Sequence, residues 1–171
     1  MTPSTVGVPA RLSRPATWVD VDLAHIEHNA RLLSRLATVP LMAVVKANGY
    51  GHGAVAVAGA ALRGGAAWCG VARPDEAVEL RRGGVGCPIL LLGWAPSQTL
   101  PELIAAGVSL TVWSPDQVTE IAAAARTLGR RARLHLKVDT GMSRLGLPPE
   151  EIVEFSRAIA ATEGVTQEGL F

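Results

Sequence analysis

The chain has 171 residues, of which 49% are hydrophobic and 18% charged, which is typical of a folded globular protein and excludes a largely disordered chain. Its 16 basic and 15 acidic residues are interspersed and give a net charge of +1, which argues against a nucleic-acid or anionic-lipid partner. Because no apolar run reaches the ~18 residues of a membrane span and no signal peptide is recognisable, we expect a soluble cytoplasmic protein.

The N-terminal region is expected to contain a tail, a strand and a helix. Residues 1–15 are rich in Pro, Ser and Thr and are expected to form a disordered tail. Residues 16–22 include the sequence WVDV, which has strand character. Asp22 can then cap a helix that extends to about residue 37 and carries small and aliphatic side chains on one face.

From residue 39 onward the pattern alternates between strands and helices. The expected strands span residues 41–46, 66–71, 88–92, 109–113, 133–138 and 165–171. The expected helices span residues 50–62, 74–82, 100–106, 115–128 and 150–161. Six strands separated by five helices predict parallel strands with right-handed crossovers.

Two α/β architectures fit this alternation. One is an open, doubly wound sheet, for which six strands is a common size. The other is a (β/α)₈ barrel that lacks its last two units. The absence of a GxGxxG motif in the first turn and the presence of site residues after two well-separated strands argue against the open sheet, but the pattern alone leaves both open.

Lys46 follows the apolar run LMAVV, at the point where a parallel strand meets its loop. That end faces the active site in both architectures. The neighbouring valines shield the amine, which suits a Schiff-base nucleophile, although a strand-end lysine can equally extend into solvent. Residues 47–53 hold three glycines whose amides can approach an anion, and Tyr50 can add a hydroxyl donor.

A second polar group lies in the sequence HLKVDTGMSRLG at residues 135–146. Alternation along the expected strand places His135, Lys137 and Asp139 on one face, which would point inward in a barrel and need partners there. Arg144, on the following loop, is a planar donor suited to an oxyanion or a phenolate. A salt-bridge cluster at the end of the strand is the alternative interpretation.

Together, AVVKANGYGHG and HLKVDTGMSRLG resemble the alanine racemases, pyridoxal-phosphate enzymes of fold type III, and the similarity runs from about Ala16 to the last residue. The resemblance implies the (β/α)₈ TIM barrel of that family, truncated to about six βα units within residues 23–171. It also implies that residues 16–22 pair with a C-terminal β-domain that the chain lacks. The implied activity is the interconversion of L- and D-alanine by a homodimer, which supplies D-alanine for peptidoglycan.

The resemblance also implies roles for individual residues. Lys46 would form the internal aldimine with pyridoxal phosphate and act as one of the two racemising bases. Tyr50 would bind the cofactor phosphate, and Arg144 would donate to the phenolic oxygen of the cofactor and to the substrate carboxylate. Lys137 falls where many family members carry a carbamylated lysine, which as an anion can hold the arginine in place. No metal is implied.

Other parts of the family's site have no counterpart in this sequence. The base on the opposite face of the substrate is a tyrosine from the C-terminal domain of the partner subunit, whereas the only tyrosine here is Tyr50. The histidine that stacks on the cofactor ring would follow Phe171. We therefore expect an incomplete racemase that is inactive alone. Two alternatives are a non-catalytic pyridoxal-phosphate-binding or partner-binding α/β domain, and a racemase for another small amino acid such as serine.

Overall fold

The computed structural model describes residues 17–171 and begins with the expected N-terminal helix. Helix α1 (Leu23–Leu36) is capped by Asp22, whose carboxylate accepts a hydrogen bond from the Ala24 amide at 2.8 Å. Residues 17–22 contain no strand, so the pairing of residues 16–22 with a further domain stays a prediction. The expected tail over residues 1–15 lies outside the described residues.

Six strands follow, and helices join each strand to the next. The strands are β1 (Leu41–Val44), β2 (Ala66–Val71), β3 (Ile89–Leu91), β4 (Val108–Val112), β5 (Ala132–Leu136) and β6 (Val165–Leu170). The helices are α2 (Lys46–Tyr50), α3 (Ala54–Arg63), α4 (Pro74–Arg82), α5 (Leu100–Ala105), α6 (Pro115–Thr127) and α7 (Ile152–Ala161). The predicted alternation is confirmed, and the start of α3 is the one boundary that was badly wrong.

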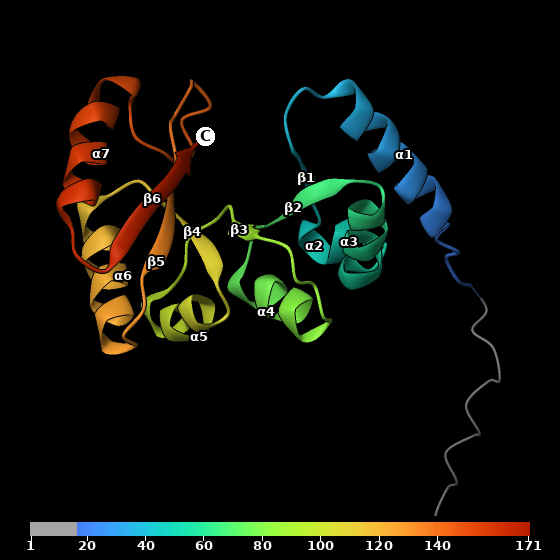
Figure 1. Ribbon diagram of the computed structural model, residues 1–171, viewed down its shortest axis with the longest axis horizontal. Helices are drawn as coiled ribbons and strands as arrows, with labels where there is room; N and C mark the ends of the chain where they lie inside the picture. Colours follow the sequence, from blue (N-terminus) through green and yellow to red (C-terminus); the bar gives the residue numbers. More distant parts are fainter. Residues whose placement is uncertain (1–16) are drawn as a thin grey trace, which may run out of the picture.

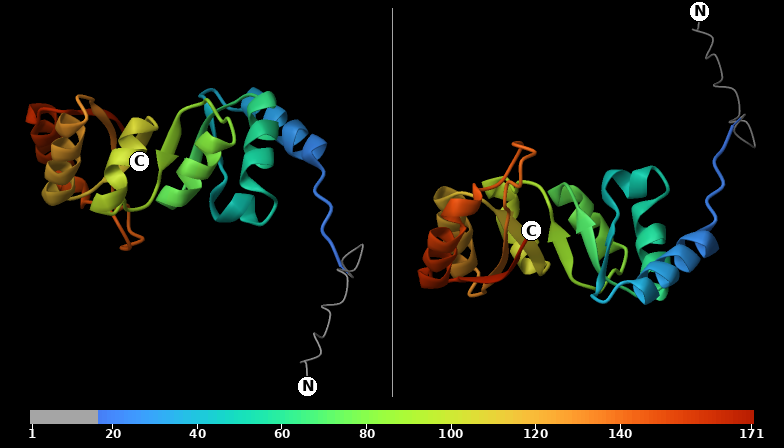
Figure 2. Two further views of the ribbon diagram at one scale, coloured as in Figure 1. Left: turned by 90° about the horizontal axis from the view of Figure 1, so that it is seen from below. Right: turned by 90° about the horizontal axis from the view of Figure 1, so that it is seen from above.

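The strand order decides between the two architectures. The strands are hydrogen-bonded in the order β1-β2-β3-β4-β5-β6, and every pair is parallel. A doubly wound sheet reverses its strand order at a switch point, whereas a barrel keeps the order of the chain. The fold is therefore a partial (β/α) barrel, in which the helices lie along the outer side of the strands (Figure 1). Further views show the units succeeding one another from α1 at one end to α7 at the other (Figure 2).

The hydrophobic core lies between the strands and the outer helices. Leu110, Leu134 and Leu136 are fully buried on this side of the sheet, and Leu103 and Ile159 are among the helix residues buried in the same cluster. Burial of this aliphatic layer is the main favourable term in folding. No helix within residues 17–171 has both the length and the apolar content to cross a lipid bilayer.

Strand β4 carries polar side chains on its inner face. Ser109 and Thr111 alternate with Leu110 on β4 and are also buried. The Thr111 hydroxyl donates a hydrogen bond to the Leu91 carbonyl at 2.6 Å, so this buried polar group has a partner. Ser109 and Thr111 therefore lie on the face of β4 opposite to Leu110 and the outer helices.

Candidate active site

An open cavity of about 360 Å³ lies at the carboxyl ends of the strands. It is lined by Lys46, Lys137 and Arg144 together with Ala72, Leu92, Gly93, Leu145 and Phe171. These residues follow β1, β2, β3, β5 and β6, so the cavity is built where active sites of parallel barrels lie. Both lysines of the chain are in this set. The structure thus brings together three of the four site residues that the sequence indicated.

The cavity is cationic. Within residues 17–171, none of Lys46, Lys137 and Arg144 forms an ion pair with a carboxylate. Lys137 instead places its Nζ 4.5 Å from the centroid of the Phe171 ring, in a cation–π contact. Lys137 and Arg144 therefore take no part in a salt-bridge cluster among residues 17–171, whereas His135 of the same motif lies 3.6 Å from the Glu168 carboxylate. Three cations without acidic partners favour an anionic ligand.

The segment α2 is a left-handed turn and not a regular α-helix, which explains why the predicted start of the next helix was wrong. Ala47, Asn48, Gly49 and Tyr50 have φ values of 52°, 53°, 61° and 55°. Left-handed backbone costs roughly 1–2 kcal/mol for each non-glycine residue, so a helix continuous from Tyr50 was the simpler expectation. The turn instead runs through the glycines, and α3 begins at Ala54.

Hydrogen bonds within the turn hold this backbone in place. The Gly49 amide donates to the Val45 carbonyl at 2.9 Å, and the Asn48 side chain accepts the Ala54 amide at 2.9 Å. His52 adds a contact of 2.9 Å between its Nδ1 and the Gly49 carbonyl. Tyr50, at the end of the turn, is 60% exposed and is not among the residues that line the cavity, so its role toward a phosphate stays a prediction.

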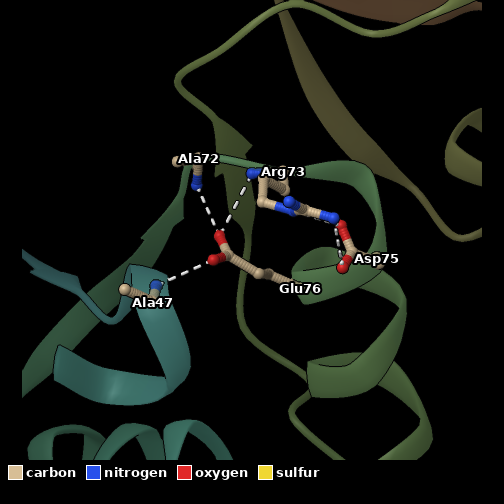
Figure 3. A network of polar contacts seen from close by, with 5 residues as sticks. All are labelled: Ala47, Ala72, Arg73, Asp75 and Glu76. Carbon is tan, nitrogen blue, oxygen red and sulfur yellow. Dashed lines mark hydrogen bonds and ion pairs between the residues drawn. The ribbon is translucent and has the colours of Figure 1, made fainter. Parts of the chain in front are cut away.

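Glu76 is a polar residue of this region that the sequence interpretation missed. It lies in the first turn of α4, is 9% exposed, and accepts hydrogen bonds from the amides of Ala47, Ala72 and Arg73 (Figure 3). A glutamate two residues after Pro74 indicates a helix cap, which is a signal the sequence does contain. The bond to Ala47 spans 29 residues, and no local pattern predicts it.

The loop that carries Arg144 folds back onto the end of β5. The Asp139 amide donates to the Leu147 carbonyl at 2.8 Å, and the Leu147 amide donates to the Lys137 carbonyl at 2.9 Å. The Asp139 carboxylate accepts the amides of Gly141 and Ser143 at 3.0 and 2.9 Å. These amides, Ser143 first, hold the pKa of Asp139 below its ordinary value. Asp139 therefore shapes the loop around Arg144.

His135 faces the interior of the partial barrel, as the alternation of β5 predicted. Its ring packs edge-on against Trp68, with centroids 5.6 Å apart, and its Nε2 lies 3.6 Å from Glu168, which is longer than a hydrogen bond. Glu168 accepts a hydrogen bond from the Ser109 hydroxyl at 2.6 Å and lies 3.6 Å from Arg133. Burial lowers the pKa of His135, and the Glu168 carboxylate only partly opposes this effect.

The lowered pKa of His135 predicts a pH dependence of stability. As the pH falls below the ordinary value of 6.5, the unfolded chain takes up a proton on this histidine before the folded protein does. We therefore expect the free energy of unfolding to be level above pH 6.5 and to fall as the pH drops toward the lower folded pKa. Chemical denaturation at several pH values measures this slope. The variant His135→Gln should flatten it, and an unchanged slope in that variant would assign the effect to other groups.

The region that contains this cavity matches known proteins. A family model described as alanine racemase, N-terminal domain, matches residues 21–171, which include every residue lining the cavity. An alanine racemase of Symbiobacterium thermophilum is 46% identical over 156 residues, which cover 91% of this chain and 41% of the relative. An alanine racemase of Salinispora tropica is 48% identical over 145 residues, which cover 85% of this chain and 39% of the relative.

Solved structures show the same fold. Alanine racemase from a D-cycloserine-producing Streptomyces lavendulae superposes with a TM-score of 0.82 at 41% identity, covering 88% of this chain and 40% of that one. Alanine racemase from Bacillus anthracis, solved with bound L-Ala-P, superposes with a TM-score of 0.82 at 36% identity. The superposition covers 94% of this chain and 42% of the racemase chain. The chain therefore spans about two fifths of the length of the relatives and structures it matches.

Proposed function

Because this chain belongs to the alanine racemase family, we propose that the protein interconverts L- and D-alanine with pyridoxal phosphate held in the cavity of Lys46, Lys137 and Arg144. The observation that carries the proposal is the convergence of Lys46, Lys137 and Arg144 on one cavity at the carboxyl ends of the strands, where no carboxylate within residues 17–171 pairs with them. That convergence occurs within the region that the family model matches.

The residues present fit this cofactor. Pyridoxal phosphate carries a phosphate and a phenolic oxygen, and a cavity lined by two lysines and an arginine suits such an anion. Lys46 would hold the cofactor covalently, Arg144 would donate to its phenolic oxygen, and Tyr50 would bind its phosphate. When bound, pyridoxal phosphate supplies an electron sink that acidifies the Cα proton of an amino acid.

The side chains of this chain would then bind the substrate and move its proton. Arg144 would hold the substrate carboxylate, which orients the Cα–H bond. Lys46 would take up or return the Cα proton at its Nζ, on one face of the substrate. A carbamate on Lys137 would turn this cation into an anion that holds Arg144. Leu92 and Leu145 would limit water near the reacting proton.

Racemisation needs a second base on the opposite face, and Lys46 can serve only one. The family resemblance assigns that role to a tyrosine of a partner subunit, and the sole tyrosine of this chain, Tyr50, lies outside the cavity lining. The proposal therefore includes a homodimer. It also places this enzyme in the cytoplasm, where it would supply D-alanine for peptidoglycan. A polypeptide of residues 1–171 alone is expected to racemise no alanine.

The proposal is tested with protein expressed from the complete gene. D-Alanine formed from L-alanine is measured by chiral chromatography with added pyridoxal phosphate, with L-serine as the competing substrate and residues 1–171 alone as a second sample. We expect turnover of alanine at an ordinary enzymatic rate, on the order of 1–10³ s⁻¹, and much slower turnover of serine. Cofactor binding without racemisation would show a non-catalytic domain, and faster turnover of serine would change the assigned substrate. Turnover by residues 1–171 alone would contradict the need for a partner's base.

A further inference from the structure

We infer that Glu76 is a positioning residue for Lys46: by holding the Ala47 amide, it stabilises the left-handed turn that presents the lysine to the cavity. The inference rests on the proposed function, because it concerns Lys46 as the reactive lysine. It assigns Glu76 no contact with substrate or cofactor. Its effect would pass entirely through the backbone.

The contacts of Glu76 reach in two directions. Oε2 accepts the amides of Ala72 and Arg73 at 2.8 and 3.1 Å, which caps the start of α4. Oε1 accepts a hydrogen bond from the Ala47 amide at 2.7 Å (Figure 3). Ala47 belongs to the preceding βα unit. One carboxylate therefore joins the loop after β1 to the loop after β2. Both loops contribute to the cavity, through Lys46 and Ala72.

Lys46 lies between two anchored backbone amides. On its N-terminal side, the Val45 amide donates to the Gly70 carbonyl at 2.8 Å, which continues the pairing with β2. On its C-terminal side, the Ala47 amide donates to Glu76. Ala47 has a φ of 52°, a left-handed conformation that alanine rarely adopts and that persists only where surrounding contacts hold it. Without Glu76, Ala47 can relax, and the direction of the Lys46 side chain changes with it.

Helix α6 shows which side-chain groups are needed to cap a helix in this fold. At the same position of α6, Gln117 accepts the amides of Trp113 and Ser114 at 2.8 and 3.1 Å through a single oxygen. This contact pattern matches that of Glu76 with Ala72 and Arg73. An amide side chain is therefore sufficient to cap a helix in this fold. The second oxygen of Glu76 is needed only for Ala47, because the NH₂ group of a glutamine would meet that amide with a donor.

No ion pair accounts for the burial of the Glu76 carboxylate. Its neighbour Arg73 binds Asp75 instead, at 2.9 and 3.1 Å, as Figure 3 shows. Across residues 17–171, no cation forms an ion pair with Glu76. Burying a carboxylate without a cationic partner is costly unless hydrogen bonds compensate. Three amide donors provide that compensation, and one of them is the amide next to Lys46.

The test compares Glu76→Gln with the control Gln117→Ala in protein expressed from the complete gene. Each protein is stripped of cofactor, and added pyridoxal phosphate is trapped with cyanoborohydride. The rate of modification of Lys46 is followed by peptide mass spectrometry across a range of pH. We expect Glu76→Gln to slow this rate at least about tenfold and to change its pH profile, since displacing a reacting group by about 1 Å can cost 100-fold. The control, which removes a helix cap elsewhere, should stay within about twofold of the unchanged protein.

The outcomes separate the inference from the proposed function. Modification of Lys46 in Glu76→Gln at the unchanged rate and with the unchanged pH profile would overturn the inference alone. If Lys46 of the unchanged protein is not modified, the proposed function is overturned, and the inference about Glu76 falls with it. If Glu76→Gln does not fold, Glu76→Asp replaces it, because it keeps a negative charge in the first turn of α4 while its side chain, one methylene shorter, withdraws from the Ala47 amide. Rapid modification of Lys46 in Glu76→Asp would then overturn the inference.

Discussion

Replacing Lys46 by alanine is expected to lower kcat for alanine racemisation by at least about 10²–10⁴-fold, the usual contribution of a general acid or base. The loss should be larger if the covalent attachment of the cofactor is also required. Within residues 17–171 the Lys46 side chain forms no ion pair, so the fold should survive the change. Steady-state kinetics and thermal unfolding of the same preparations measure the two effects separately.

Lys46→Arg is the matched variant for this experiment. It keeps a positive charge at the end of β1 but does not supply an amine that can form a Schiff base or exchange a proton near neutral pH. We expect its kcat to fall as far as that of the alanine variant. Substantial activity in Lys46→Arg would show that only the charge matters, which would contradict the role proposed for Lys46.

Replacing Gly146 by alanine is expected to lower the free energy of unfolding by about 1–3 kcal/mol and kcat/KM by about 100-fold. A Cβ at this position would lie 2.6 Å from the Asp139 backbone nitrogen and 2.7 Å from the Val138 carbonyl carbon, with a φ of 120°. The backbone contacts cannot move away as a flexible side chain could. The loop must therefore shift, and Arg144, which it carries, would leave the cavity.

Gly141 provides the control in the same loop. Its φ of 114° is also unfavourable for alanine, but a Cβ there would meet nothing within 4 Å. Gly141→Ala should therefore show the backbone cost, roughly 1–2 kcal/mol, without the steric displacement. Denaturation and kinetics of both variants separate the two causes. Equal losses of kcat/KM in the two variants would contradict the proposed displacement of Arg144.

The sequence predicted the order of the elements well, but it could not choose between the two architectures on pattern alone. Apolar runs separated by helices occur in open sheets and in barrels alike, since both bury the strands against helices. Strand order depends on which edges pair, and no local residue pattern records it. The resemblance to the alanine racemases predicted the barrel, and the observed order of strands β1 to β6 confirms that prediction.

The part of the candidate site that lies at the ends of strands could be predicted from the sequence. Lys46 follows an apolar strand and Lys137 follows a strand with one apolar face, and parallel strands bring their carboxyl ends to one side. The left-handed turn was not predictable, because Ala47 and Tyr50 adopt backbone conformations that their residue types disfavour. Such a conformation depends on distant contacts, and the bond from Ala47 to Glu76 across 29 residues is one of them.

The identity of the lysine that binds the cofactor tests the whole account most directly. The chain has only two lysines, Lys46 and Lys137, and both line the cavity. Protein from the complete gene is loaded with pyridoxal phosphate, reduced with borohydride, digested and analysed by mass spectrometry. We predict a pyridoxyl adduct on the peptide that contains Lys46 and none on the peptide that contains Lys137. An adduct on Lys137, or on neither lysine, would contradict the proposed site.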